Sequence, residues 1–207
     1  MKITRFTHAA VLVETKNVRL AIDPGEFGTI PDLTSVDAVL ITHDHFDHIS
    51  HEAVAKAVAA KPELPVYGPA SLAETAEFAV RSVDDGDSFD VGGVRIDVVG
   101  HLQDTTSLDD PEILNVGFLI DGRLLHPGDA LQPVAAEILL LPMETPWAKN
   151  VDRERALEAN PPKYVIPIHD APLGDLGVEF EMHTAEKLAT RVGATAIPLH
   201  DGESVEL

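Results

Sequence analysis

The sequence contains no cysteine among its 207 residues. This absence excludes disulfide bonds, zinc ribbons and thiol nucleophiles, so any bound metal would need His, Asp or Glu ligands. No apolar run approaches the about 20 residues of a membrane-spanning helix, and we expect no membrane segment. Residues 1–15 lack the long apolar centre of a signal peptide, so we expect a cytoplasmic protein.

Basic residues are scarce, with 15 Lys and Arg against 35 Asp and Glu, which gives a formal net charge of −20. An acidic surface repels phosphate backbones and anionic membranes, so we expect no nucleic-acid partner. The same acidity is typical of a highly soluble protein or a salt-adapted host, and the sequence carries no signal for the oligomeric state.

Short apolar runs alternate with helical patterns along the whole chain, and no Pro/Gly/Ser-rich linker divides it. We therefore expect a single domain over residues 1–207. The patterns predict strands and helices of mixed α/β type, with antiparallel hairpins beside strand–helix units. The strands expected before the first helix cover 3–6, 10–14, 18–23 and 38–42, and the expected helices cover 51–60, 70–81, 152–159 and 178–192.

Two parts of the chain resemble each other. Residues 11–26 are similar to 116–130, and 38–44 are similar to 164–170. The similarity indicates either an internal duplication or chance likeness between strands. A duplication would bring two sets of strand ends together at one edge of the fold.

The segment that follows the apolar run 38–42 reads HDHFDH and carries five titratable side chains in six residues. His43 and His45 point the same way in an extended segment, and Asp47 and His48 follow as the chain turns. Imidazole and carboxylate groups suit zinc, and manganese or iron with less preference. Four such groups exceed the needs of one metal, which indicates two. The alternative interpretation is a solvated polar loop.

Three other predicted strands end at a potential ligand. These residues are His101, Asp129 and His169. Because ligand sites of α/β proteins usually lie at strand ends, we expect the three to converge with the first segment. The sequence then supplies seven ligands, enough for two metals with an open position.

The segment THDHFDH resembles the His-x-His-x-Asp-His signature of the metallo-β-lactamase-fold hydrolases, and the order of the later ligands agrees. Residues 1–15, IDPG at 22–25 and VIPIHD at 165–170 resemble more narrowly the hydrolases related to L-ascorbate 6-phosphate lactonase. The resemblance implies a four-layer αββα sandwich. It also implies one metal on His43, His45 and His101, a second on Asp47, His48 and His169, and Asp129 as the bridge.

Five neutral histidines and two carboxylates contribute −2 against +4 from two divalent ions. Such a centre lowers the pKa of bound water towards about 7 and so provides a nucleophile at neutral pH. We expect a hydrolase with two divalent ions, zinc in preference to Mn²⁺ or Fe²⁺, which cleaves a small ester, lactone or phosphodiester. Asp47 is the expected catalytic residue, as a proton acceptor.

Some features depart from parts of the family. The residues after His101 lack the Thr-Pro-Gly of the thioester-cleaving members, and His45 stands where the di-iron redox branch has Glu. The alternatives are a mononuclear iron oxygenase on the same fold, a nucleic-acid phosphodiesterase, and a non-catalytic metal-binding protein. His8, His126 and Trp147 are further candidates for contact with the substrate or support of the ligands, with ordinary structural roles as the alternative.

Overall fold

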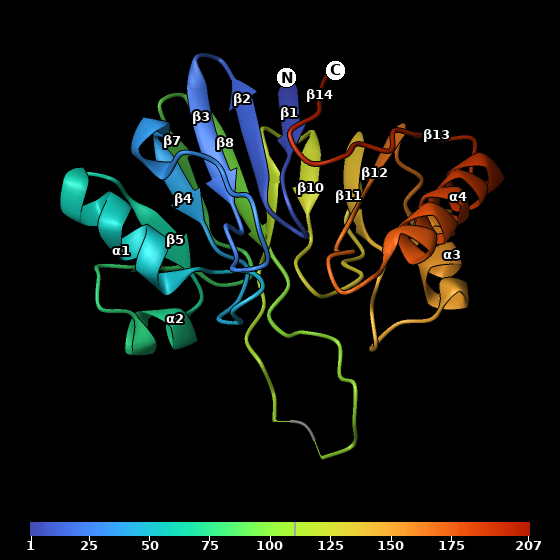
Figure 1. Cartoon of the computed structure of the whole chain (residues 1–207), viewed down its shortest axis with the longest axis horizontal. Coiled ribbons are helices and arrows are strands. Elements are labelled where there is room, and N and C mark those ends of the chain that lie inside the picture. Colours follow the sequence, from blue (N-terminus) through green and yellow to red (C-terminus); the bar gives the residue numbers. More distant parts are fainter. Residues whose placement is uncertain (110) are drawn as a thin grey trace.

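The computed structural model describes residues 1–109 and 111–207, which form two seven-stranded sheets (Figure 1). In spatial order, the first sheet consists of β14 (Ser204–Glu206), β1 (Lys2–Arg5), β2 (Val11–Thr15), β3 (Val18–Ile22), β4 (Ala38–Leu40), β5 (Val66–Gly68) and β6 (Arg81–Ser82). The second consists of β13 (Thr195–Ala196), β12 (Tyr164–Ile168), β11 (Ile138–Pro142), β10 (Leu124–His126), β9 (Gly117–Ile120), β8 (Val94–Val99) and β7 (Ser88–Val91).

The helices lie on the outer faces of the two sheets. They are α1 (His51–Ala60), α2 (Ala70–Thr75), α3 (Asn150–Ala159) and α4 (Asp175–Arg191), with a short 3₁₀ turn η1 (Leu33–Ser35). Figure 1 shows α1 and α2 beside the first sheet and α3 and α4 beside the second. Three apolar cores separate the layers, one between the sheets and one under each pair of helices. This arrangement confirms the expected αββα sandwich.

Strand β4 explains why the run before the histidines is apolar without interruption. Ala38 and Leu40 belong to the core between the sheets, whereas Val39 packs in the core under α1. A strand covered on both faces needs apolar residues at every position. Its parallel neighbours β3 and β5 have the same direction, so their carboxyl ends lie at one edge. Strands β10, β11 and β12 are likewise parallel in the second sheet.

The two similar sequence segments occupy related places in different sheets. Hairpin β2–β3 turns at Lys16 and Asn17, and hairpin β9–β10 turns at Asp121 and Gly122; all four residues have positive φ. Two consecutive positive-φ residues match the twist of a tight hairpin. The correspondence is incomplete, because β4 pairs directly with β3 whereas β11 separates β12 from β10.

One helix is shorter than its sequence pattern predicts. The pattern predicts a helix over 70–81, but α2 ends at Thr75 and Arg81 begins strand β6. The cause is tertiary packing, because Phe78 and Val80 lie against the apolar core under α1 and Arg81 pairs with Tyr67 of β5.

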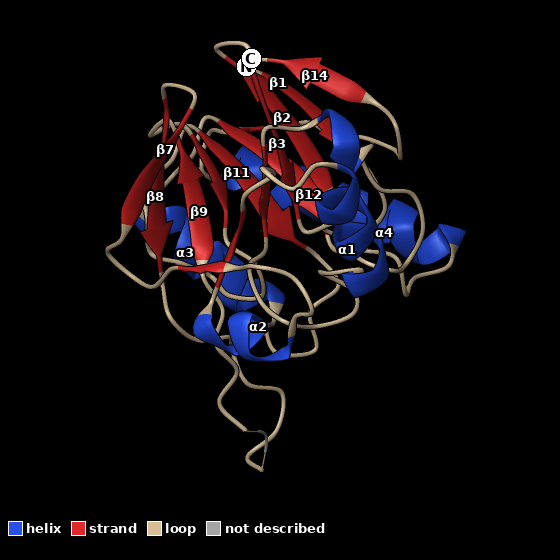
Figure 2. Cartoon of the chain, turned by 90° about the vertical axis from the view of Figure 1, so that its left-hand side faces the viewer, coloured by secondary structure: helices blue, strands red, loops and turns tan. Residues whose placement is uncertain are grey.

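The chain ends meet in the first sheet, where β14 pairs with β1. The first sheet therefore combines strands from both ends of the sequence. The described residues between β8 and β9, 100–109 and 111–116, extend beyond the ends of both sheets (Figures 1 and 2). Among the described residues, no helix is both long and apolar enough to cross a membrane.

Candidate metal centre

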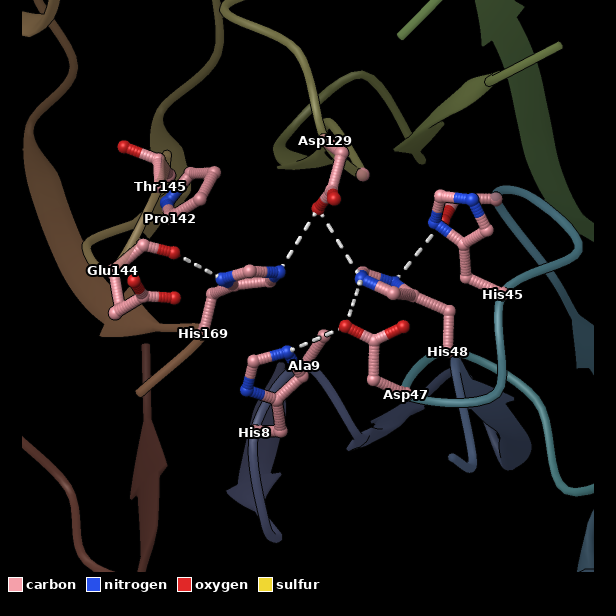
Figure 3. Close-up of polar contacts among 12 residues, drawn as sticks. His8, Ala9, His45, Asp47, His48, Asp129, Pro142, Glu144, Thr145 and His169 are labelled. Carbon is pink, nitrogen blue, oxygen red and sulfur yellow. Dashed lines mark hydrogen bonds and ion pairs between the residues drawn. The ribbon is translucent and has the colours of Figure 1, made fainter. Parts of the chain in front are cut away.

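A cluster of imidazole and carboxylate groups lies at the strand ends between the two sheets (Figure 3). Two groups have ligand atoms within 4.8 Å of one another: His43, His45 and Asp129 in one, and His8, Asp47, His48 and His169 in the other. Figure 3 shows that the labelled members of both groups surround one point. The structure therefore brings together six of the seven residues predicted as ligands.

The 43–48 segment is held by the loop after β3. The backbone N–H of Glu26 donates to the carbonyl of Phe46 at 2.8 Å, and that of Ser50 donates to the carbonyl of Pro24 at 2.7 Å. A Cβ atom on Gly25 would lie 1.9 Å from the carbonyl oxygen of Asp47. Only glycine therefore allows these two loops to approach so closely.

Asp129 is positioned by a fully buried asparagine. The side chain of Asn115 accepts a hydrogen bond from the backbone N–H of Asp129 at 2.9 Å and donates to the carbonyl of Pro127 at 3.0 Å. Gly128, with φ +64°, leaves room for the same Asn115 side chain. This loop fixes the Asp129 carboxylate between the two groups, with Oδ1 3.2 Å from His48 Nε2 and Oδ2 3.7 Å from His43 Nε2.

Hydrogen bonds at Nδ1 fix the orientation of three imidazoles. His48 Nδ1 lies 2.7 Å from Asp23 Oδ2, and His169 Nδ1 donates to the carbonyl of Glu144. His43 Nδ1 lies 3.0 Å from the hydroxyl of Thr42. That hydroxyl donates its own proton to Asp23 at 2.7 Å, so it accepts from His43.

In the neutral form of these three rings the proton therefore sits on Nδ1, and Nε2 presents a lone pair to the centre. This is the tautomer that supports a metal ligand.

The atoms that face the centre lie close to one another but lack well-formed hydrogen bonds among the described residues. His48 Nε2, His169 Nε2 and Asp129 Oδ1 are buried without a hydrogen bond of acceptable geometry among the described residues. Both Nε2 atoms lie 3.1–3.2 Å from Asp129 Oδ1. Buried polar atoms are rarely left unpaired. A divalent cation between them would satisfy all three, so the residues fit a metal.

The electrostatics of the centre also favour a cation. Burial alone would lower the pKa of His48, but the carboxylates of Asp129 and Asp23 outweigh it and raise that pKa well above its usual value. Burial alone would raise the pKa of Asp129, but the neighbouring imidazoles hold it well below the usual range. Without metal, a proton on His48 thus balances two buried carboxylates, and a metal would replace that proton.

His8 differs from the other imidazoles in its tautomer. Its Nδ1 accepts a hydrogen bond from the backbone N–H of Ala171 at 3.2 Å, so the ring proton sits on Nε2. Nε2 faces Asp47 Oδ2 at 3.3 Å. Burial lowers the pKa of His8 to about 4, which keeps the ring neutral at pH 7. In this state the proton on His8 Nε2 is directed towards Asp47 without a hydrogen bond of acceptable geometry, and the position of His8 would also suit a ligand.

His101 lies apart from both groups in this structure, whereas the family resemblance implies a place beside His43 and His45. Gly100, with φ +78°, turns the chain there, and His101 Nδ1 pairs with Asp84 at 2.6 Å. The imidazole is half-exposed and lines a separate cavity of about 130 Å³. Gln103 reaches the centre instead, where its amide donates to Asp129 Oδ2 at 3.3 Å.

The two remaining candidates, His126 and Trp147, have different surroundings: His126 is buried in the fold, and Trp147 lines a cavity. His126 is fully buried, lies near Asp23, and bonds through Nε2 to the carbonyl of Ala9 at 2.9 Å. His126 therefore has a structural role near the loop that carries Asp129, and it is not among the residues that line the cavity at the metal centre. Trp147 lines a cavity of about 380 Å³ that also includes His45, Asp47, Asp129 and His169.

Sequence reasoning missed Asp23 and Asn115. Asp23 is fully buried, and its carboxylate serves both Thr42 and His48. The available signal was a carboxylate at the end of the strand 18–23, in the IDPG segment. Asn115 carried no comparable signal, because its role depends on the loop before Asp129.

Known proteins are similar to this chain in sequence and in fold. Residues 2–169 match the family described as Beta-lactamase superfamily domain. The Protein Rv0786c of Mycobacterium tuberculosis is 31% identical over 179 residues, which is 83% of this chain and 84% of that protein. The UPF0173 metal-dependent hydrolase NEQ378 of Nanoarchaeum equitans is 28% identical over 228 residues, with all of both chains covered.

Among solved structures, the metallo hydrolase Igni18 of Ignicoccus hospitalis superposes with a TM-score of 0.75 at 22% identity, and 99% of this chain and 97% of that chain are covered. This likeness concerns the fold. The narrower likeness to L-ascorbate 6-phosphate lactonase stays a prediction. The resemblance read from HDHFDH is confirmed: the chain belongs to the metallo-β-lactamase superfamily of metal-dependent hydrolases.

Proposed function

We propose that this enzyme holds two divalent metal ions and hydrolyses a small ester or lactone. One ion would bind His43, His45 and Asp129. The other would bind Asp47, His48 and His169, with Asp129 between the two. The observation that carries the proposal is the convergence on one point of buried Nε2 and Oδ1 atoms that form no hydrogen bond of acceptable geometry among the described residues.

The donor set contains nitrogen and carboxylate oxygen only, which suits Zn²⁺ and also accommodates Mn²⁺ or Fe²⁺. When bound, two such ions supply a water of lowered pKa and stabilise the negative charge that develops on the attacked group. His43, His45 and Asp129 would hold the first ion with three protein ligands, the number found in catalytic zinc sites.

Asp47 is suited to hold a metal and then to accept a proton. Burial alone would raise the pKa of Asp47, but the contact with His8 and the charge of His48 outweigh it and hold the pKa below its usual range. Asp47 is thus an anion at neutral pH. Its side chain is about one-fifth exposed and lines the cavity, so a substrate can reach it.

His8 would keep Asp47 in place. The backbone N–H of Ala171 holds the His8 ring from behind, and the carbonyl of His8 accepts a hydrogen bond from the N–H of His169 at 2.9 Å. His8 is therefore connected to two proposed ligands. A donor at this position supports the carboxylate without competing for the metal.

The experiment couples elemental analysis of the purified protein to an activity screen with neutral esters, lactones and phosphodiesters. We expect about two divalent ions per chain, and the variants His43→Ala and Asp129→Ala should lose metal and activity while remaining folded. His183→Ala on the exposed face of α4 is the control and should keep both. Unchanged metal stoichiometry in the first two variants would refute the ligand assignment.

The same metal analysis separates the alternatives when single-stranded DNA and RNA are added to the activity screen. A single iron per chain would favour a mononuclear oxygenase, and hydrolysis of single-stranded DNA or RNA would favour a nuclease. Metal without turnover of any substrate would favour a metal-binding protein. We propose a small-molecule substrate, because a net charge of −20 opposes the approach of a polyanion.

A further inference from the structure

The cavity beside the metal centre has an aromatic wall that is open to solvent. The rings of Phe27 and Phe46 meet edge to face with centroids 5.2 Å apart, and the residues are 40% and 60% exposed. Trp147, Pro146 and Pro172 extend the apolar lining. Exposed large apolar side chains around a cavity of about 380 Å³ are typical of a ligand-binding site.

The charged residues of the same cavity all have one sign. Beyond the proposed ligands Asp47 and Asp129, the lining includes Asp104 and Glu144. Among the described lining residues there is no Lys or Arg. Apart from the proposed metal centre, the described lining therefore offers an anionic group no cationic side chain.

The neighbouring arginines are already paired elsewhere. Arg155 lies in an adjoining hollow, is largely exposed and pairs with Asp152 at 3.4 Å. Arg5 is buried and binds Asp170, and buried Arg153 binds backbone carbonyls. None of the three lines the cavity at the metal centre.

We infer that the substrate is an ester or lactone whose remaining part is uncharged and apolar, and that a phosphate or carboxylate away from the scissile bond is rejected. The inference rests on the proposed hydrolase and specifies its substrate. The apolar part would contact Phe27, Phe46 and Trp147. A remote anion would instead lie near the carboxylates of Asp104 and Glu144, and no Lys or Arg is among the described residues that line the cavity.

Two 4-nitrophenyl esters of equal chain length test the charge preference. The hexanoate is neutral, and the adipate monoester carries a carboxylate at the far end of the acyl chain. We expect kcat/KM for the adipate to be about tenfold lower, the effect of one uncompensated like charge. Asp104→Asn combined with Glu144→Gln should narrow this ratio, whereas Glu179→Gln on the exposed face of α4 should leave it unchanged.

A chain-length series tests the aromatic wall. Phe46→Ala should lower kcat/KM for the hexanoate more than for the acetate, because only the longer chain reaches the wall. Phe180→Ala is the matched control, since Phe180 is exposed on α4 and does not line this cavity. Equal effects of Phe46→Ala on both esters would refute the contact.

A binding measurement separates failure of this inference from failure of the hydrolase proposal. Trp147 is the only tryptophan, so its fluorescence reports on the cavity. In protein stripped of metal by a chelator, 4-nitrobenzyl alcohol should quench it at lower concentration than 4-nitrobenzoate does. Equal quenching together with equal hydrolysis of hexanoate and adipate would overturn the inference and leave the hydrolase standing. Preferential quenching without hydrolysis of any ester would leave the cavity preference standing and refute the hydrolase.

Discussion

Replacing Asp23 by asparagine is expected to weaken metal binding without unfolding the chain. The Asp23 carboxylate accepts hydrogen bonds from the backbone N–H of Thr42 at 2.8 Å, the Thr42 hydroxyl at 2.7 Å and His48 Nδ1 at 2.7 Å. All three partners donate a proton to the carboxylate. In the asparagine variant one carboxylate oxygen becomes an NH₂ group, which is itself a donor and cannot accept these hydrogen bonds. The backbone of Asp23 has φ +48°, a conformation that asparagine tolerates.

The expected magnitude follows from the His48 tautomer. The amide oxygen of the introduced asparagine would keep the Thr42 backbone N–H, and the amide nitrogen would then replace the oxygen that faces His48. His48 would relieve this contact by carrying its proton on Nε2, which removes the lone pair that a metal needs. Partners that orient a ligating histidine change metal affinity about 10–100-fold, which corresponds to about 1.4–2.7 kcal/mol.

The assay is a competition titration of Zn²⁺ against a chromophoric chelator, with circular dichroism as the check on folding. Asp32→Asn is the matched control, because Asp32 is exposed and only caps η1, where asparagine caps equally well. Unchanged zinc affinity in Asp23→Asn would refute the argument that Asp23 sets the orientation of His48.

Three further outcomes follow from the same geometry. His8→Ala should keep its metal but lose about 10–100-fold in kcat, and His8→Gln, which retains an N–H towards Asp47, should recover part of it. In metal-free protein, the free energy of unfolding should fall as the pH rises through the raised pKa of His48, because Asp23 and Asp129 then lose the positive charge of the imidazolium. Thermal unfolding of metal-loaded protein at the same pH values should not show this fall. Gly25→Ala should cost about 1–3 kcal/mol of unfolding free energy, because the added Cβ meets a backbone carbonyl that cannot move aside. Gly174→Ala, where a Cβ meets nothing within 4 Å but a residue favoured at the start of α4 is lost, should cost about 1 kcal/mol of unfolding free energy or less.

The sequence predicted the parts of the centre that depend on local order. The residues 43–48 lie in one loop, and a buried strand precedes them, so their convergence needs no knowledge of the fold. Predicting that Asp129 and His169 join this loop required one further inference, about the direction of their strands. Both follow strands that are parallel in the second sheet, and the carboxyl ends of parallel strands share an edge.

The residues that sequence reasoning missed depend on which strands are neighbours. Asp23 supports His48 because β3 pairs with β4 and both end at the same edge. A carboxylate at the end of a strand is common, so it carries little signal by itself. The order of the strands in a sheet cannot be predicted from a single segment of the sequence. His8 illustrates a second limit, since its role follows from a single backbone N–H at Ala171, which is 163 positions away.

His101 shows why position along the chain does not by itself make a ligand. The resemblance assigns His101 to the metal of His43 because it aligns backbone positions, whereas the direction of a side chain at a strand end depends on local dihedral angles. Gly100 at φ +78° turns this segment so that His101 pairs with Asp84, and Gln103 reaches the Asp129 carboxylate. Metal content of His101→Ala distinguishes the two assignments. Retained metal agrees with this geometry, whereas loss of one ion would show that the segment reorients when metal binds.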